Sequence, residues 1–174
     1  MRIQILLAAL FALNLALIWL AHARPKVLGW YRSAAGIFAL LIPLSSVFFP
    51  QPHFELDYFW WRIAGGLFIL GGLALIAWAG RVLTDGFPRP GLLPPRLITG
   101  GPYALVRHPV YLGLIFILVG WWWLWAAVYS FYFGLICLAL IWLEAYLEEK
   151  ILLGPKFGAE FGAYRRQTGM FWIK

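Results

Sequence analysis

One uninterrupted apolar run limits the folds open to this chain more than any other feature. Residues 108–143 contain no Asp, Glu, Lys or Arg. As a single helix this run would be about 54 Å long at 1.5 Å per residue, whereas the hydrocarbon core of a bilayer is about 30 Å thick. Two legs of about 18 residues each would just cross it. The run therefore predicts a helical hairpin that turns back between Trp125 and Ser130.

Three further uncharged stretches precede the hairpin, at about 3–23, 33–54 and 63–80. Each is close to the roughly 20 residues of a transmembrane helix, and none alternates with the period of two that a barrel strand requires. The chain is 63% hydrophobic and 12% charged, far from the balance of soluble domains. We expect an all-α integral membrane bundle of about five transmembrane helices in one domain, 1–174, with scaffold helices in 1–80 and the functional half in 81–174.

The basic residues predict the orientation of this bundle. If the helices alternate, twelve of the fourteen Lys and Arg residues fall on one side: Arg24, Lys26, Arg32, Arg81, Arg89, Arg96, Arg107, Lys150, Lys156, Arg165, Arg166 and Lys174. Because short cytoplasmic loops are enriched in Lys and Arg, the N-terminus should lie outside and the C-terminal segment in the cytoplasm. We expect a cytoplasmic membrane, that of a prokaryote, with the lipid bilayer as the main partner. A cleaved signal peptide ending at Ala21-His22-Ala23 is the rival interpretation of the first helix.

Composition also excludes several classes of function. The net charge is +7, but the basic residues sit in short loops and form no dense stripe, so we expect no nucleic acid partner. Cys137 is the only cysteine, which excludes a disulfide framework within the chain. The three histidines are dispersed along the sequence, so we expect no metal site.

The longest polar interruption, residues 81–109, is the first place to look for a site, because it is rich in Pro and Gly and long structured loops are often functional. It ends in Arg107 and His108, where the hairpin starts. A hairpin with two equal legs returns the chain to the face it left, so these residues should approach Glu148 and Glu149 at its end. The alternative is that both groups are ordinary interfacial or solvated residues at helix ends.

The residues around the hairpin carry a resemblance. The order is Gly100-Gly101-Pro102-Tyr103, Arg107-His108-Pro109-Val110-Tyr111-Leu112-Gly113, Glu148-Glu149, Phe157-Gly158 and Tyr164. It resembles the isoprenylcysteine carboxyl methyltransferase family and related membrane phospholipid methyltransferases, over about residues 94–172.

This resemblance implies a transferase that moves a methyl group from S-adenosylmethionine to a lipophilic, membrane-embedded acceptor. It assigns catalytic roles to Arg107, His108 and Glu148. It assigns cofactor binding to Tyr103, Arg107, His108, Pro109, Tyr111, Leu112, Gly113, Glu148 and Glu149, with Tyr164 as a weaker candidate. His108 would act as a base or only bind the cofactor.

The sequence departs from the family pattern at three places: Glu144 where Arg is common, Phe161 where Tyr is frequent, and a C-terminal end without the usual Pro. The acceptor therefore stays open among carboxylates, amines and thiols, as does the oligomeric state. Other classes also stay open. A non-catalytic membrane subunit or lipid-binding protein is the main one; a nicotinamide-dependent reductase lacks a glycine fingerprint, and a haem carrier lacks a facing His pair.

Overall fold

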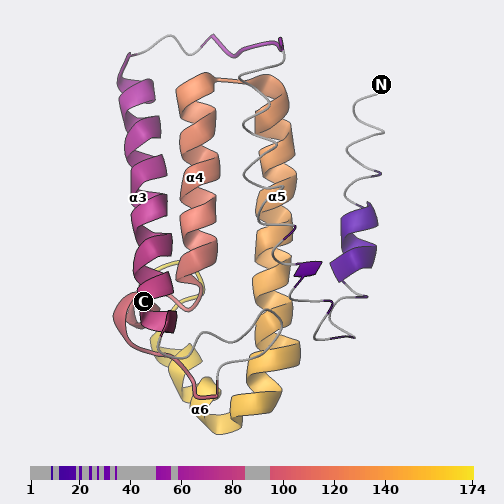
Figure 1. Ribbon diagram of the computed structural model, residues 1–174, viewed down its shortest axis with the longest axis vertical. Helices are drawn as coiled ribbons and strands as arrows, with labels where there is room; N and C mark the ends of the chain where they lie inside the picture. The colour runs from indigo at the N-terminus through magenta and orange to yellow at the C-terminus, as the bar shows by residue number, and fades with distance from the viewer. Residues whose placement is uncertain are drawn as a thin grey trace.

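The computed structural model describes residues 50–55, 59–84 and 95–174, together with residues 9, 12–18, 20, 24, 27, 30, 31 and 34. These residues form helices and connecting turns without a β-strand. The helical elements, in order, are α3 (Phe59–Thr84), the 3₁₀ turn η1 (Gly101–Ala104), α4 (Pro109–Trp125), α5 (Val128–Leu147), the π-helical segment η2 (Glu148–Leu153) and α6 (Gly154–Gln167). Helices α3, α4 and α5 run alongside one another, and α6 lies across one end (Figure 1).

The expected all-helical fold is thus confirmed for the described residues. The predicted stretches 3–23 and 33–54 fall largely outside them, although residues 12–18 are helical. Two described segments are long and apolar enough to cross a membrane, Phe59–Leu83 and Val128–Gln167, and the apolar helix α4 is shorter. In the most apolar 18-residue stretch of each segment, only 17% of Phe59–Leu83 and 33% of Val128–Gln167 is buried inside the molecule. Such broad exposed apolar surface is unusual for a soluble domain and suits a lipid environment.

Helices α3 and α4 touch through their backbones at two pairs of glycines. A Cβ added to Gly65 would lie 2.6 Å from the carbonyl oxygen of Gly120, and one added to Gly72 would lie 2.5 Å from that of Gly113. The two glycines on each helix, Gly65 and Gly72 on α3 and Gly113 and Gly120 on α4, are seven residues apart, so they lie on one face of their helix. Because glycine has no side chain, the helices approach closely in the way that small residues permit in membrane bundles.

The hairpin turns where the run length predicted. Helix α4 ends at Trp125 and α5 begins at Val128; between them Ala126 has left-handed backbone angles, with φ 49°. Segment 50–55 closes over this turn, since the Phe54 amide donates to the Ala126 carbonyl at 2.7 Å and the Val128 amide donates to the Pro52 carbonyl at 3.0 Å. This end of the hairpin is therefore held by backbone hydrogen bonds, at the opposite end of the bundle from α6 (Figure 1).

At the other end, α5 continues into a wider turn before α6. Residues Glu148–Leu153 are π-helical, and α6 contains a break at Gly158, where φ is 49°. A π-helical turn adds a residue to the helix and shifts the side chains that follow it around the axis, which is a common feature of functional sites. Here the turn begins at the Glu148-Glu149 pair.

Candidate functional site

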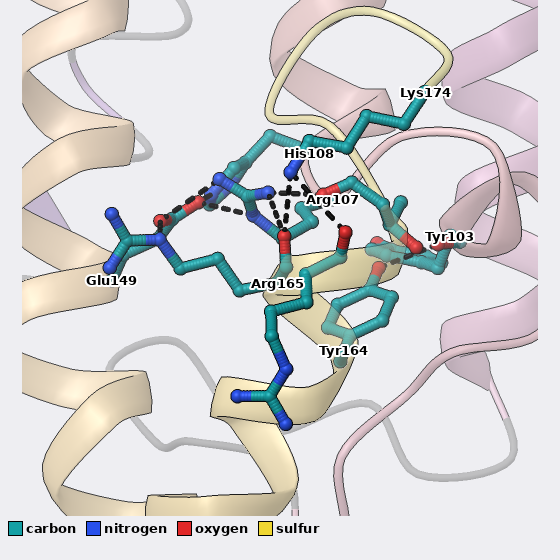
Figure 2. Close-up of polar contacts among 9 residues, drawn as sticks. Tyr103, Arg107, His108, Glu149, Tyr164, Arg165 and Lys174 are labelled. Atoms are coloured by element: carbon teal, nitrogen blue, oxygen red, sulfur yellow. Dashed lines mark hydrogen bonds and ion pairs between the residues drawn. The ribbon is translucent and has the colours of Figure 1, made fainter.

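The site is organised around a buried ion pair between the two ends of the hairpin. The Arg107 side chain lies just before α4, and its Nε donates to Glu149 Oε1 at 2.7 Å while its Nη2 donates to Glu149 Oε2 at 3.1 Å. The relative exposures of the two residues are only 9% and 5%. This is the two-point geometry in which a guanidinium binds a carboxylate most strongly. The convergence that the hairpin length predicts therefore occurs (Figure 2).

His108 shares the same carboxylate. Its Nε2 lies 3.1 Å from Glu149 Oε1, and the imidazole is 6% exposed. The ring stacks on Tyr111, with centroids 5.5 Å apart and planes inclined by 17°, and it also contacts Phe171 at 6.1 Å. These contacts fix both the position of the imidazole and the direction of its ring nitrogens.

The C-terminal segment completes this arrangement from below the hairpin. The Arg107 amide donates to the Gly169 carbonyl at 2.9 Å, and the His108 amide donates to the Met170 carbonyl at 3.3 Å. The Arg107 Nη1 donates to the carbonyls of Thr168 and Arg165. All three nitrogens of the guanidinium are thus engaged within the protein. Arg107 therefore connects the start of the hairpin to the C-terminal segment, residues 165–174.

Glu148, the glutamate that precedes Glu149 in sequence, has a different set of neighbours. The Tyr111 hydroxyl donates to Glu148 Oε2 at 3.1 Å, and the Tyr164 hydroxyl donates to the Tyr103 carbonyl at 2.6 Å. Burial raises the pKa of the Tyr103 hydroxyl, and the negative charge of Glu148 raises it further. Glu148 and Tyr103 are both half-buried. This side of the site is therefore rich in oxygen atoms and reachable from outside, unlike the Arg107–Glu149 pair.

The charge states in the buried part follow from its contacts. Burial alone would raise the pKa of Glu149, but the hydrogen bonds from His108 and Arg107, together with the Arg107 charge, outweigh it and leave the pKa below its ordinary value. Glu149 is therefore ionised at neutral pH and can only accept hydrogen bonds. It follows that His108 Nε2 carries a hydrogen. In the neutral ring, Nδ1 then holds the lone pair and is the atom able to take up a proton.

The remaining predicted residues have different surroundings. Pro109 begins α4, because its fixed φ suits the first helical position. Its side chain is fully buried. Leu112 is half-buried, and its amide donates to the His108 carbonyl at 2.9 Å. Gly113 lies against α3, where an added Cβ would be 2.6 Å from Ile76. The structure thus places Gly113 in the α3–α4 contact rather than among the polar side chains, and Glu144 is buried on α5 one turn before Glu148.

Several residues that hold the site together were not predicted. They belong to the end of the chain: Arg165, Thr168, Gly169, Met170 and Phe171. Arg165 is 57% exposed, yet its Nε lies 3.9 Å from Glu149 Oε2 (Figure 2). Most of the other contacts use backbone carbonyls, which any residue type provides. The one available signal was Arg107 itself, because a buried guanidinium has five N–H donors and a single carboxylate cannot satisfy them all.

Comparison of the chain with protein-family models, with curated proteins and with solved structures gave no match. The resemblance described above therefore depends on the short motifs themselves and on where the structure places them.

Proposed function

We propose that this protein is an integral membrane methyltransferase that uses S-adenosylmethionine and acts on a lipophilic acceptor. The observation that carries the proposal is the convergence of the two motif groups: Arg107 and His108 meet Glu149 across 41 or 42 residues of sequence, and Tyr111 meets Glu148. The two motif groups that carry the resemblance thus lie together at one end of one hairpin.

The half-buried side of the site suits the polar groups of the cofactor. S-adenosylmethionine presents an ammonium group and ribose hydroxyls, which need oxygen acceptors, and Glu148 with the hydroxyls of Tyr103 and Tyr111 supplies them. Arg107 supports the site by fixing Glu149, and binds the cofactor carboxylate only if its present bonds rearrange. Methyl transfer from a sulfonium depends chiefly on holding two reactants in line and excluding water, so a site with fixed side chains is suitable for it.

His108 is placed to act as the base where the acceptor needs one. A protonated amine must lose a proton to expose the lone pair that attacks the methyl group, and a thiol must lose one to become the reactive thiolate, whereas a carboxylate is already ionised. The Nδ1 atom would receive that proton, since Nε2 is held by Glu149.

The proposed topology has five transmembrane helices with the C-terminus in the cytoplasm. It is supported by the apolar lengths of α3 and α5 and by the distribution of Lys and Arg. With this orientation a water-soluble cofactor enters from the cytoplasm while the acceptor arrives through the bilayer. A tag fused after Lys174 should react with an impermeant reagent only after the cells are opened; reaction in intact cells would reverse the orientation.

Calorimetric binding of S-adenosylmethionine to the detergent-solubilised protein tests the site directly. We expect saturable binding by the wild-type protein and weaker binding by Glu148→Gln and by His108→Ala, both still folded. Glu160→Gln is the matched control, since Glu160 is an exposed carboxylate on α6. Unchanged affinity in both site variants would remove the site assignment. Absence of binding by the wild-type protein would favour the non-catalytic membrane subunit.

Incubation with methyl-labelled S-adenosylmethionine and a membrane lipid extract then tests the reaction. We expect label to move into the lipid fraction, and alkaline treatment of the product separates the acceptor classes. A methyl ester releases labelled methanol, whereas N-methyl and S-methyl products retain the label. Binding without any transfer would leave a cofactor-binding protein and contradict the enzymatic proposal.

A further inference from the structure

An exposed surface of mixed basic and apolar side chains lies at the end of the chain. We define the C-terminal surface as Arg165, Arg166, Trp172, Ile173 and Lys174. Trp172 is 62% exposed and Ile173 is 71% exposed, although both are large apolar residues. Arg165 and Arg166 occupy the last turn of α6. The site described above uses none of these side chains except for the long contact from Arg165 to Glu149.

Hydrogen bonds make this surface one unit. Lys174 Nζ donates to the Arg165 carbonyl at 3.0 Å and to the Arg166 carbonyl at 3.5 Å. The final residue is thereby held against the end of α6, as Figure 2 shows for Lys174 and Arg165. Two apolar side chains and three cationic groups consequently share one small region, instead of projecting from a loose chain end.

The location of this surface limits what can cover it. It follows α5 by one short helix, at the end of the bundle opposite the hairpin turn (Figure 1). Lys150 and Lys156 lie between α5 and the C-terminal surface, in η2 and at the start of α6. Five basic residues just after an apolar spanning helix form a pattern that binds anionic lipid headgroups, and tryptophan beside them favours the interface between headgroups and acyl chains.

We infer that the C-terminal surface binds anionic phospholipids of the membrane in which the protein resides. The cationic groups contact the lipid phosphate, whereas the Trp172 and Ile173 side chains enter the region between the headgroups and the acyl chains. The inference depends on the membrane location of the chain but not on methyl transfer. It has a consequence for the site, because the same segment supplies the carbonyls of Thr168, Gly169 and Met170 that hold Arg107 and His108. Lipid bound at its end therefore stabilises the ion pair.

The test is lipid binding by the full chain in neutral detergent micelles. The probes are dioctanoyl phosphatidylglycerol, dioctanoyl phosphatidylcholine and glycerophosphoglycerol, which carries the same headgroup without acyl chains. Native mass spectrometry measures binding, and thermal melting measures stabilisation. We expect the wild-type protein to bind phosphatidylglycerol most tightly and to melt at a higher temperature with it, and we expect both effects to weaken with salt.

Variants assign the binding to this surface. Each basic side chain near an anionic surface contributes about fivefold in affinity, so Arg166→Gln combined with Lys174→Gln should lower it roughly 25-fold. Trp172→Ser should lower it at constant charge, and Arg62→Gln, near the hairpin turn, should not. Arg166→Gln alone provides a milder variant if the double variant folds poorly.

Three outcomes would overturn the inference. Equal binding of the two phospholipids would remove the role of charge. Equally tight binding of glycerophosphoglycerol would indicate a phosphate site instead of a lipid surface. Wild-type affinity in Arg166→Gln, in the double variant and in Trp172→Ser would place the lipid elsewhere.

Discussion

The Arg107 guanidinium and the Glu149 carboxylate lie 42 residues apart in sequence and form a two-point ion pair with distances of 2.7 and 3.1 Å. The pair closes the end of the hairpin opposite its turn. Since Arg107 also donates to the carbonyls of Arg165 and Thr168, a single side chain connects α4, the end of α5 and the C-terminal segment. The stability of this end of the molecule should therefore depend on the pair more than on any surface charge.

Removing one partner of the pair should destabilise the protein strongly. Glu149→Gln leaves the buried guanidinium with one neutral oxygen in place of the carboxylate, and breaking a buried pair in this way costs about 3–5 kcal/mol. The free energy of unfolding can be measured by titration with sodium dodecyl sulfate in micelles. Glu160→Gln on the exposed part of α6 should change it by less than about 0.5 kcal/mol. Equal small effects of the two substitutions would show that the pair contributes little.

Acid should weaken the same pair. The fold holds the pKa of Glu149 below its ordinary value of 4.5, so the carboxylate stabilises the native state above that pH. This contribution is lost as the pH falls below 4.5 and through the lower pKa of the folded state. We expect the melting temperature of the wild-type protein to fall across this window, and that of Glu149→Gln to fall less. Parallel curves for the two proteins would assign the acid sensitivity to other carboxylates.

The length of the apolar run made much of this architecture predictable. A 36-residue run has to fold back in a bilayer, and Pro109 marks where its first leg begins. These two facts place Arg107 and His108 near Glu149 before any contact is known. The helical fold follows equally well, because a lipid environment leaves the backbone few alternatives.

The rest of the site depends on information that side-chain patterns do not carry. The carbonyls of Gly169 and Met170 bind the Arg107 and His108 amides, and their positions are set by the backbone path after α6. Gly113 lies against α3, where its lack of a side chain admits the Gly72 backbone. Its assignment to the cofactor stays a prediction, and the side-chain pattern alone does not identify α3 as the neighbour of this glycine. The five transmembrane helices and their orientation stay predictions.

Tyr164 connects α6 to the loop before the hairpin, and alkaline pH should break that connection. Burial raises the pKa of its hydroxyl to about 12, an effect that the Arg107 charge partly opposes. The neutral phenol donates to the Tyr103 carbonyl at 2.6 Å, so its stabilising effect is complete below pH 10 and lost as the pH rises from 10 to 12.

The matching variant is Tyr164→Phe, which should lower the free energy of unfolding by about 1 kcal/mol at neutral pH. It should also remove a tyrosine that ionises late in an ultraviolet titration. Tyr132→Phe on the exposed face of α5 is the control and should leave the free energy of unfolding nearly unchanged. Burial also raises the pKa of Tyr103, so the readout is the amplitude of the late titration, which should fall by one tyrosine in Tyr164→Phe. An unchanged amplitude would contradict the assignment to Tyr164.

Two substitutions of His108 separate its proposed role as a base from its structural role. Gln places its amide nitrogen near the position of Nε2 and can still donate to Glu149, but it has no group equivalent to the Nδ1 lone pair. Asn places its amide near Nδ1 and loses the bond to Glu149. For an acceptor that must lose a proton, His108→Gln should keep S-adenosylmethionine binding and lower the methylation rate about 10²- to 10⁴-fold.

His108→Asn should instead reduce stability as well as the rate, since Glu149 loses a donor. Binding is followed by calorimetry and methylation by transfer of label. For a carboxylate acceptor, His108→Gln should transfer methyl groups at nearly the wild-type rate. That result, together with an alkali-labile product, would exclude the base role and leave His108 as a binding residue.

The glycine contacts between α3 and α4 give a comparison in which position alone changes. Gly65 and Gly66 are adjacent on α3, so they share the same depth and hydropathy. A Cβ at Gly65 would lie 2.6 Å from the Gly120 carbonyl oxygen, whereas one at Gly66 meets nothing within 4 Å. Gly65→Ala should therefore force the helices apart at a cost of about 1–3 kcal/mol, while Gly66→Ala should gain up to about 1 kcal/mol from its helix propensity. Unfolding of the two variants in micelles measures the difference. If Gly65→Ala were the more stable of the two, the backbone contact between α3 and α4 would not exist in the folded protein.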